Sequence, residues 1–186
     1  AGLRDVEPVA LDIRDRPSLL KAMEGTDHLY HCAALVDSHS SRERLLEVNA
    51  AGTRLVWECA AAAGVKKAMY CSSAAVYGLL AGSGTGVTEQ VRARAIEPYG
   101  YSKRLGEEAA LDVALRTGLH TTIIRPVAIF GPGEHTPFGR RLRSAVLSKL
   151  LIAGGFQGKR FSFVHVRDVA AAAVHLMAQD LPSGEI

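Results

Sequence analysis

Residues 28–71 read HLYHCAALVDSHSSRERLLEVNAAGTRLVWECAAAAGVKKAMYC, and the pattern of apolar residues in this stretch decides the fold class. Short apolar runs at 28–32 and 68–71 predict two strands. Between them, apolar residues at helical spacing predict a long helix over about 41–63, and Gly64 follows at the position that ends many helices. A strand, a helix and a strand in this order predict two parallel strands joined by a helical crossover.

The same alternation extends along the chain in both directions. It predicts an α/β fold in which a doubly wound parallel sheet carries helices on both faces. Such sheets bind ligands at the carboxyl ends of their strands, so we expect a site in the loops after Cys32, Cys71 and Ile124. The other predicted elements are strands at 9–11, 120–124 and 160–164, helices at 15–25, 98–117, 139–150 and 168–178, and a loop at 78–97.

The composition limits the classes of protein to which this chain can belong. Of its 186 residues, 48% are hydrophobic and 22% are charged, which is typical of a globular protein. The net charge of +3 is too small to predict a nucleic-acid partner. No apolar run reaches the roughly 18 residues that span a bilayer, residues 1–7 do not resemble a signal peptide, and the three cysteines form no CxxC pair. We therefore expect a cytoplasmic protein with no membrane partner.

The histidines near the first predicted strand raise the question of a metal site. His28, His31 and His39 lie close to Cys32 in the sequence. On a strand, however, His28 and His31 point to opposite faces and cannot hold one ion together. We expect no metal site.

Two segments that follow predicted strands carry side chains suited to proton transfer. Ser73 comes just after the strand that ends at Cys71, and Tyr99 and Lys103 lie one turn apart on a helix that begins with Pro98. A phenol has a pKa of about 10, and a neighbouring ammonium group lowers it. Lowering it by three units requires about 4 kcal/mol, which we expect from Lys103 together with a cationic cofactor ring. An exposed tyrosine and lysine on a surface helix are the alternative interpretation.

The likeness of this chain to a known family depends on seven stretches: Asp12-Ile13, Tyr30-His31-Cys32-Ala33-Ala34, Val48-Asn49-Ala50-Ala51-Gly52-Thr53, Ser72-Ser73-Ala74-Ala75-Val76-Tyr77-Gly78, Tyr99-Gly100-Tyr101-Ser102-Lys103, Arg125-Pro126 with Phe130-Gly131-Pro132-Gly133, and Phe163-Val164-His165-Val166-Arg167-Asp168-Val169-Ala170. In this order they resemble the extended short-chain dehydrogenase/reductase family, in its sugar-nucleotide epimerase/dehydratase branch. The resemblance implies a Rossmann-like sheet and NAD or NADP as cofactor. It also implies a secondary alcohol or ketone, in particular of a nucleotide sugar, as the small-molecule substrate.

The resemblance further implies roles for individual residues. Ser73, Tyr99 and Lys103 would be the catalytic set, with Ser73 also binding the substrate and Asn49 supporting the site. Tyr99 and Lys103 would contact the cofactor as well, Lys103 at the nicotinamide ribose. The other implied cofactor contacts are Asp12 and Ile13 at the adenine, the backbone of Ala33 and Ala34, and Pro126 beside the nicotinamide.

The chain departs from the family pattern at both ends. The family's glycine-rich phosphate loop follows its first strand, and no such segment precedes Asp12. The residue that selects NAD or NADP is missing too, so both cofactors remain open. We expect part of a longer enzyme, in which residues 1–130 form an incomplete dinucleotide-binding domain. Residues 131–186 would hold the start of a substrate lobe and a returning strand and helix.

Ala74 and Ala75 bear on which of the family's reactions this chain is suited to. In the family, members that dehydrate nucleotide sugars carry an Asp-Glu pair at this place, which acts as acid and base. Dehydration is therefore disfavoured, and epimerisation or carbonyl reduction remains. Arg140 and Arg141 are expected to bind a diphosphate or carboxylate of the substrate, with a solvated helix face as an equal alternative.

Two expectations concern the protein as a whole. The resemblance alone implies a homodimer. A non-catalytic regulatory protein that senses a dinucleotide on the same fold is the alternative from another functional class. Because this chain keeps Ser73, Tyr99 and Lys103 together, we favour an enzyme.

Overall fold

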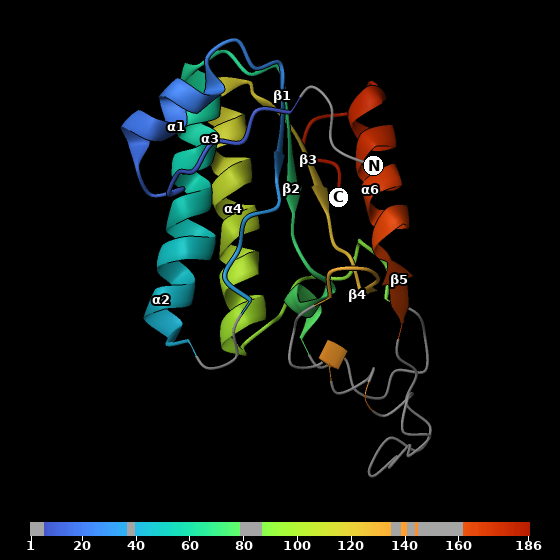
Figure 1. Ribbon diagram of the computed structural model, residues 1–186. Helices are drawn as coiled ribbons and strands as arrows, with labels where there is room; N and C mark the ends of the chain where they lie inside the picture. The colour runs from blue at the N-terminus through green and yellow to red at the C-terminus, as the bar shows by residue number, and fades with distance from the viewer. Residues whose placement is uncertain (1–5, 37–39, 79–86, 135–138, 141–143, 145–161) are drawn as a thin grey trace.

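The computed structural model describes residues 6–36, 40–78, 87–134, 139–140, 144 and 162–186. A parallel sheet in the order β1-β2-β3 lies at the centre of the molecule (Figure 1). Its strands are β1 (His28–His31), β2 (Lys67–Cys71) and β3 (His120–Ile124). His31 pairs with Tyr70 and Cys71 with Ile124, so the carboxyl ends of the three strands meet at one edge. The predicted α/β fold with a parallel sheet is confirmed.

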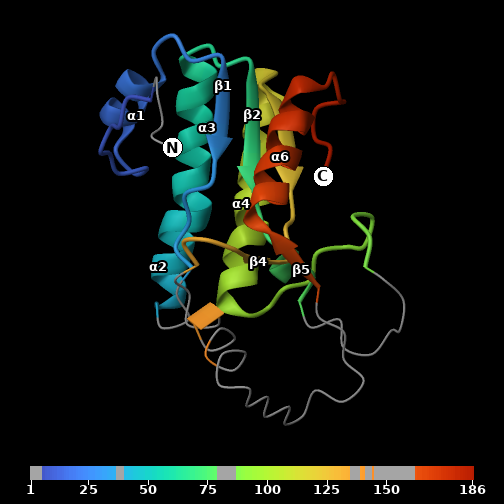
Figure 2. The same ribbon diagram turned by 45° about the vertical axis from the view of Figure 1, so that its right-hand side comes forward.

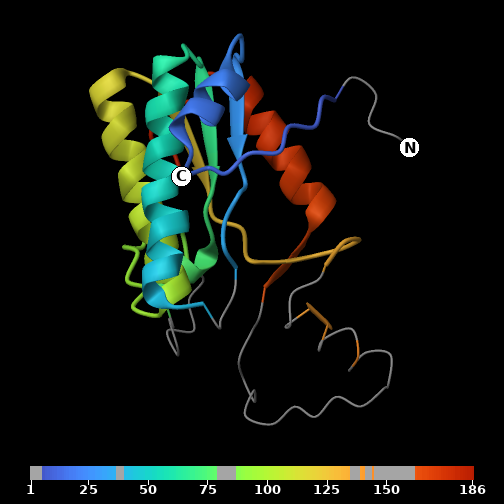
Figure 3. The same cartoon turned by 60° about the vertical axis from the view of Figure 1, so that its left-hand side comes forward.

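Helices cover both faces of this sheet, as the doubly wound arrangement requires. Figure 3 shows α6 (Val166–Ala178) on one face, and α3 (Thr53–Ala62) and α4 (Pro98–Thr117) on the other. In Figure 2, α6 lies over β2. The remaining helical segments are α1 (Arg16–Met23), which packs against α3, and α2 (Arg42–Leu46) with the π-helical segment η1 (Glu47–Gly52), which together lead into α3.

The larger hydrophobic core lies between the sheet and α3 and α4. Trp57 and Tyr70 are fully buried there, edge to face, with 5.8 Å between their ring centroids. The indole N–H of Trp57 donates to the Thr121 hydroxyl at 3.0 Å, so burial leaves it satisfied. Alternation along β2 sends Met69 to the opposite face, where it packs against Met177 of α6.

The ends of α4 follow from local sequence signals. The Glu97 carboxylate accepts hydrogen bonds from the backbone N–H groups of Tyr99, at 3.0 Å, and of Gly100, at 2.6 Å. These bonds satisfy two of the N–H groups that a helix start leaves free. At the other end, Gly118 adopts a left-handed conformation with φ of 76°, which glycine takes without steric cost. The predicted helix at 98–117 is confirmed.

The structure corrects two of the predicted strands. Residues 9–11 form no strand, because no strand of the described chain lies beside them to accept their hydrogen bonds. The strand expected at 160–164 is β5 (Phe163–His165), and residues 160–161 lie outside the described residues. Its partner is β4 (Ala128–Phe130), a parallel strand that the sequence pattern did not predict.

The other expected elements show smaller differences. The loop expected at 78–97 is described only in part, and residues 87–97 contain no helix or strand. Most of the helix expected at 139–150 lies outside the described residues, although 139–140 and 144 are helical. The helix expected at 168–178 begins slightly earlier, as α6. In the part of the chain that the structure describes, no helix is long and apolar enough to cross a membrane.

Candidate active site

Ser73 lies at the carboxyl end of β2 and begins a short 3₁₀ helix, η2 (Ala74–Tyr77). Its hydroxyl accepts a hydrogen bond from the backbone N–H of Ala75 at 3.2 Å. The backbone N–H of Ala74, the residue directly after Ser73, donates to the carbonyl of Pro126 at 2.9 Å. Because Pro126 follows β3, this bond ties the ends of two neighbouring strands together. The structure thus brings Ser73 and Pro126 to one place.

The start of α4 is pressed against η2, and Gly100 makes this close approach possible. A Cβ atom at Gly100 would lie 2.4 Å from the carbonyl oxygen of Ala75, a distance that no side chain tolerates. Tyr99, the residue before it, is therefore held beside Ser73, near enough for the two side chains to interact. This geometry joins the two segments that the sequence analysis singled out.

The acidity of Tyr99 differs from the expectation. Burial raises the pKa of the phenol above its usual value, and the interaction with Ser73 only partly opposes this. The expected lowering of this pKa depends on Lys103 together with a cationic cofactor ring, and the residues of the chain by themselves do not produce it. Desolvation of a buried phenolate outweighs the stabilising contacts that the protein provides.

Lys103 is almost fully buried, with 1% of its surface exposed, one helical turn after Tyr99. Its ammonium group donates to the carbonyl oxygen of Cys71 at 2.8 Å and lies 4.1 Å from the centroid of the Tyr70 ring. Burial lowers the pKa of Lys103 to about 8, because a charged amine is costly away from water. The side chain is thus fixed at the carboxyl end of β2.

Asn49 connects two parts of the site without carrying chemistry itself. Its side-chain amide donates to the carbonyl of Leu35 and to the hydroxyl of Ser102, both at 3.0 Å, and accepts from the Leu35 N–H at 2.7 Å. Ser102 in turn donates to the carbonyl of Tyr99 at 2.7 Å. Asn49 belongs to η1, and π-helical turns of this kind are frequent at functional sites. These contacts suit the supporting role that the family resemblance implies for Asn49.

A buried ion pair that the sequence analysis missed braces the same region. The Arg125 guanidinium donates two hydrogen bonds to the Glu107 carboxylate, at 2.8 and 2.7 Å, and a third to the Tyr77 hydroxyl at 3.0 Å. The pair holds η2, α4 and the end of β3 in fixed positions. A sequence signal existed, because Glu107 lies four residues after Lys103 on the same face of the helix.

The remaining predicted residues lie around this centre in different ways. Asp12 is exposed and forms an ion pair with Arg14. Ile13 packs against η1, where a Cβ at Gly52 would come within 3.0 Å of it. Ala33 and Ala34 lie in the loop after β1, which the hydrogen bonds of Asn49 to Leu35 hold in place. Ala33 is exposed and Ala34 is half-buried. Arg140 is exposed, and Arg141 lies outside the described residues.

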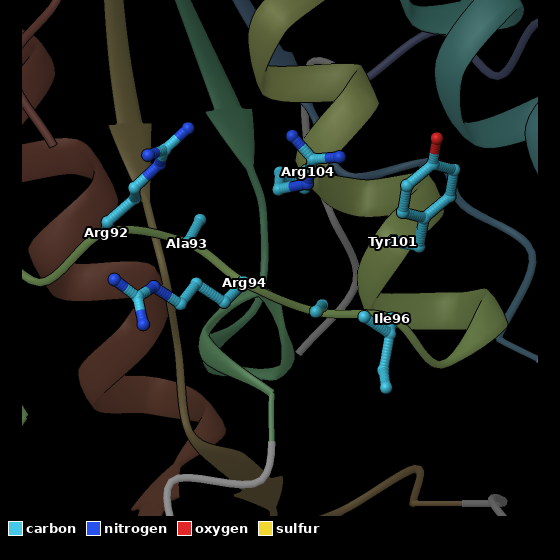
Figure 4. Close-up of a pocket in the computed structure, with 7 residues that line it drawn as sticks. Arg92, Ala93, Arg94, Ile96, Tyr101 and Arg104 are labelled. Atoms are coloured by element: carbon cyan, nitrogen blue, oxygen red, sulfur yellow. The ribbon is translucent and has the colours of Figure 1, made fainter.

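Two further observations concern other kinds of site. Among the residues with described positions, no three histidine, cysteine or acidic side chains are grouped to hold a metal ion. A pocket of about 330 Å³ is lined by residues 92–96 and by Tyr101 and Arg104 of α4, and neither Tyr99 nor Lys103 lines it (Figure 4). In Figure 4 the guanidinium groups of Arg92, Arg94 and Arg104 lie apart from one another and do not converge.

Comparison with known proteins identifies the family. The model of the NAD dependent epimerase/dehydratase family matches residues 1–186. The chain belongs to this family. One curated relative is sterol demethylase protein B of Methylococcus capsulatus, 34% identical over 94% of this chain and 53% of that protein. Another is 3beta-hydroxysteroid-dehydrogenase/decarboxylase isoform 2 of Arabidopsis thaliana, 31% identical over 93% of this chain and 31% of that protein.

Solved structures of the family share the fold. A dTDP-glucose 4,6-dehydratase from Streptomyces venezuelae, solved with NAD, matches with a TM-score of 0.81 and 26% identity over 94% of this chain and 55% of that one. The UDP-glucose 4-epimerase of Thermus thermophilus, also solved with NAD, matches with a TM-score of 0.78. It is 26% identical over 91% of this chain and 59% of that one. The chain therefore spans about half the length of these proteins.

Proposed function

We propose that the whole protein is an NAD- or NADP-dependent oxidoreductase that acts on a secondary alcohol or the corresponding ketone. The observation that carries this proposal is the close approach of Tyr99 to Ser73, with the buried Lys103 one turn away. All three side chains lie where the strands of a parallel sheet end, which is the edge where such sheets bind ligands. Membership of the NAD dependent epimerase/dehydratase family supports it independently.

The residues at this edge fit a dinucleotide. The loop after β1 carries only methyl groups at Ala33 and Ala34, and Asn49 fixes its backbone, so a ligand can approach the main chain closely. Pro126 and Lys103 would border the nicotinamide end, and Asp12 the adenine end. A bound NAD or NADP would supply the carbon that accepts or donates the hydride.

The residues of this chain would move the proton. In ketone reduction the Tyr99 hydroxyl donates its proton to the developing alkoxide, and the raised pKa of Tyr99 means that this proton is present at neutral pH. Ser73 holds the substrate oxygen by a hydrogen bond. In the direction of alcohol oxidation, the Tyr99 phenolate would accept the hydroxyl proton, with Lys103 as the nearby buried cation.

Two substrate classes are candidates, and different observations favour them. The curated relatives with 34% and 31% identity carry sterol or 3beta-hydroxysteroid names, which favours a ring-borne secondary alcohol of a sterol. The two solved structures, each 26% identical to this chain, carry nucleotide-sugar names. They favour a nucleotide sugar, which is the substrate class expected from the sequence. Dehydration is disfavoured in both cases, because Ala74 and Ala75 carry no acid or base. A homodimer and a cytoplasmic location stay predictions.

Replacement of Tyr99 tests the proposed function. We expect Tyr99→Phe in the full-length protein to lower kcat by about 10²- to 10⁴-fold, because the proton donor is lost. Tyr101→Phe is the matched control, since Tyr101 lies on the outer face of the same helix and lines the other pocket. The assay follows NADH or NADPH absorbance with a 3β-hydroxysterol and with a UDP-hexose. Epimerisation of the UDP-hexose, which leaves no net redox change, is followed by chromatography.

Two results would contradict the proposal. Turnover by Tyr99→Phe at the rate of Tyr101→Phe would remove Tyr99 from its role. Tight binding of NAD or NADP by the wild-type protein without turnover of either substrate class would favour the dinucleotide-sensing alternative. Cofactor binding measured by calorimetry separates a catalytic loss from a binding loss in each variant.

A further inference from the structure

Two of the three cysteines are neighbours at the edge of the sheet that carries the site. Cys71 is the last residue of β2, and Cys32 follows the last residue of β1. His31 pairs with Tyr70 in register, and a cysteine follows each of them, so this register brings the two cysteines next to each other. Neighbouring strands lie about 4.8 Å apart, within the Cα separation of roughly 4.4 to 6.8 Å that a disulfide needs.

The side chains of both cysteines point to the same face of the sheet. His31 and Tyr70 stack on each other with 5.6 Å between their ring centroids, in the core beneath α3. Since successive side chains of a strand alternate, Cys32 and Cys71 both point to the opposite face. All three cysteines are free thiols, Cys32 exposed and Cys71 half-buried, so a small molecule reaches the pair through Cys32.

The surroundings make the two thiols chemically unequal. The interaction between the two neighbouring thiols lowers the pKa of Cys32 and raises that of Cys71. The nearby Lys103 ammonium further favours a thiolate on Cys32. A thiolate is the form that attacks disulfides. Cys32 is thus the attacking group, and Cys71 is placed to react with it afterwards.

We propose that Cys32 and Cys71 are a modification site that a small-molecule disulfide oxidises to an intramolecular disulfide. In the first step the Cys32 thiolate attacks one sulfur of the oxidant, forming a mixed disulfide and releasing one thiolate. In the second step the Cys71 sulfur attacks Cys32, breaking the mixed disulfide and releasing the second thiolate. The two protein thiols lose two electrons and two protons, and the oxidant becomes two thiols. This chemistry does not depend on the proposed function.

The full-length protein is suited to a direct test with oxidised glutathione as the probe. After exposure, free thiols are alkylated and the unreduced protein is digested with trypsin. The three cysteines fall in separate peptides, 22–42, 55–66 and 68–92. We expect peptides 22–42 and 68–92 to be linked, and peptide 55–66 to keep the thiol of Cys59, which is completely buried. Absence of the linked pair from the digest would overturn the proposal.

Single substitutions establish the order of the two steps. Cys71→Ser should stop at a mixed disulfide on Cys32, because the second thiol is gone. Cys32→Ser should lose both the linked peptides and the mixed disulfide, whereas Cys59→Ser, the matched control, should form the link as the wild type does. A wild-type protein that accumulates the same stable mixed disulfide as Cys71→Ser, or that links two chains on a non-reducing gel, would contradict an intramolecular pair.

Discussion

Replacement of Lys103 tests the electrostatics of the site most directly. Burial lowers the pKa of this lysine from 10.5 to about 8. At pH values between about 8 and 10.5, Lys103 is protonated in the unfolded chain and neutral in the folded protein. At pH 7 the side chain is protonated in both states, and keeping this charge buried disfavours the folded state by about 3 kcal/mol. The cost falls to about 1 kcal/mol at pH 9.5. The contribution of Lys103 to the free energy of unfolding thus rises by about 2 kcal/mol over this range.

Lys103→Met removes the titrating group and keeps an apolar side chain of similar length. Urea unfolding of the full-length wild type and variant at pH 7 and at pH 9.5 gives the free energy of unfolding of each. We expect the difference between them to move by about 2 kcal/mol in favour of the wild type as the pH rises. Lys66→Met is the matched control. Lys66 is exposed, and its ion pair with Asp27 raises its pKa, so any shift has the opposite sign and is small.

A difference that stays constant between pH 7 and pH 9.5 would refute this reasoning. It would mean that Lys103 keeps an ordinary pKa in the folded protein, and therefore that its ammonium group is in contact with water. Since the measurement needs neither substrate nor cofactor, its outcome is independent of the proposed function. It tests only the burial of Lys103 beneath the end of β2.

Two further substitutions test how the site is held in place. Gly100→Ala should cost about 1–3 kcal/mol of stability through the clash with the carbonyl of Ala75. It should also lower kcat, because the clash moves α4 away from η2. An unchanged midpoint of thermal unfolding would contradict the close approach of α4 to η2. Arg125→Met should cost about 3–5 kcal/mol, because it leaves the buried Glu107 carboxylate unpaired. Adding Glu107→Gln should recover part of this loss in urea unfolding, and no recovery would contradict the ion pair.

The elements that could be predicted from the sequence are those whose ends carry local signals. Gly64 and Gly118 both adopt positive φ at the ends predicted for their helices. The strands β1, β2 and β3 are short apolar runs between such helices, and their parallel order follows from the alternation. Local information therefore suffices for the central sheet and for the loops at its carboxyl edge.

The elements that the sequence did not predict depend on partners distant in the chain. Ala128–Phe130 has only three residues, all exposed, and it is a strand because Phe163–His165 pairs with it. The run at 9–11 has a strand-like composition but no such partner among the described residues. The π-helical segment Glu47–Gly52 was not predicted either, because the spacing of apolar residues gives no sign of an extra residue in a helical turn.

Some features of the candidate site could likewise be predicted from the spacing of its residues, whereas others depend on how deeply those residues are buried in the fold. Spacing predicts that Tyr99 and Lys103 share a face of the helix, and the contact of α4 with η2 adds Ser73. Burial raises the pKa of Tyr99 in the protein by itself, and the sequence carries no sign of this, because the depth at which a side chain lies is a property of the whole fold. The ion pair of Glu107 and Arg125 was missed because its partners come from separate elements.

Burial has opposite effects on the two ionisable groups at the centre of the site, and this carries a consequence for catalysis. It raises the pKa of Tyr99 and lowers that of Lys103, so both groups are driven toward their uncharged forms. A positive charge that binds beside them stabilises the phenolate and lowers the Lys103 pKa further. The proton balance of the site is therefore decided by what binds at the carboxyl ends of the strands. The protein scaffold alone favours the protonated phenol, which is the form that could donate a proton to a substrate oxygen.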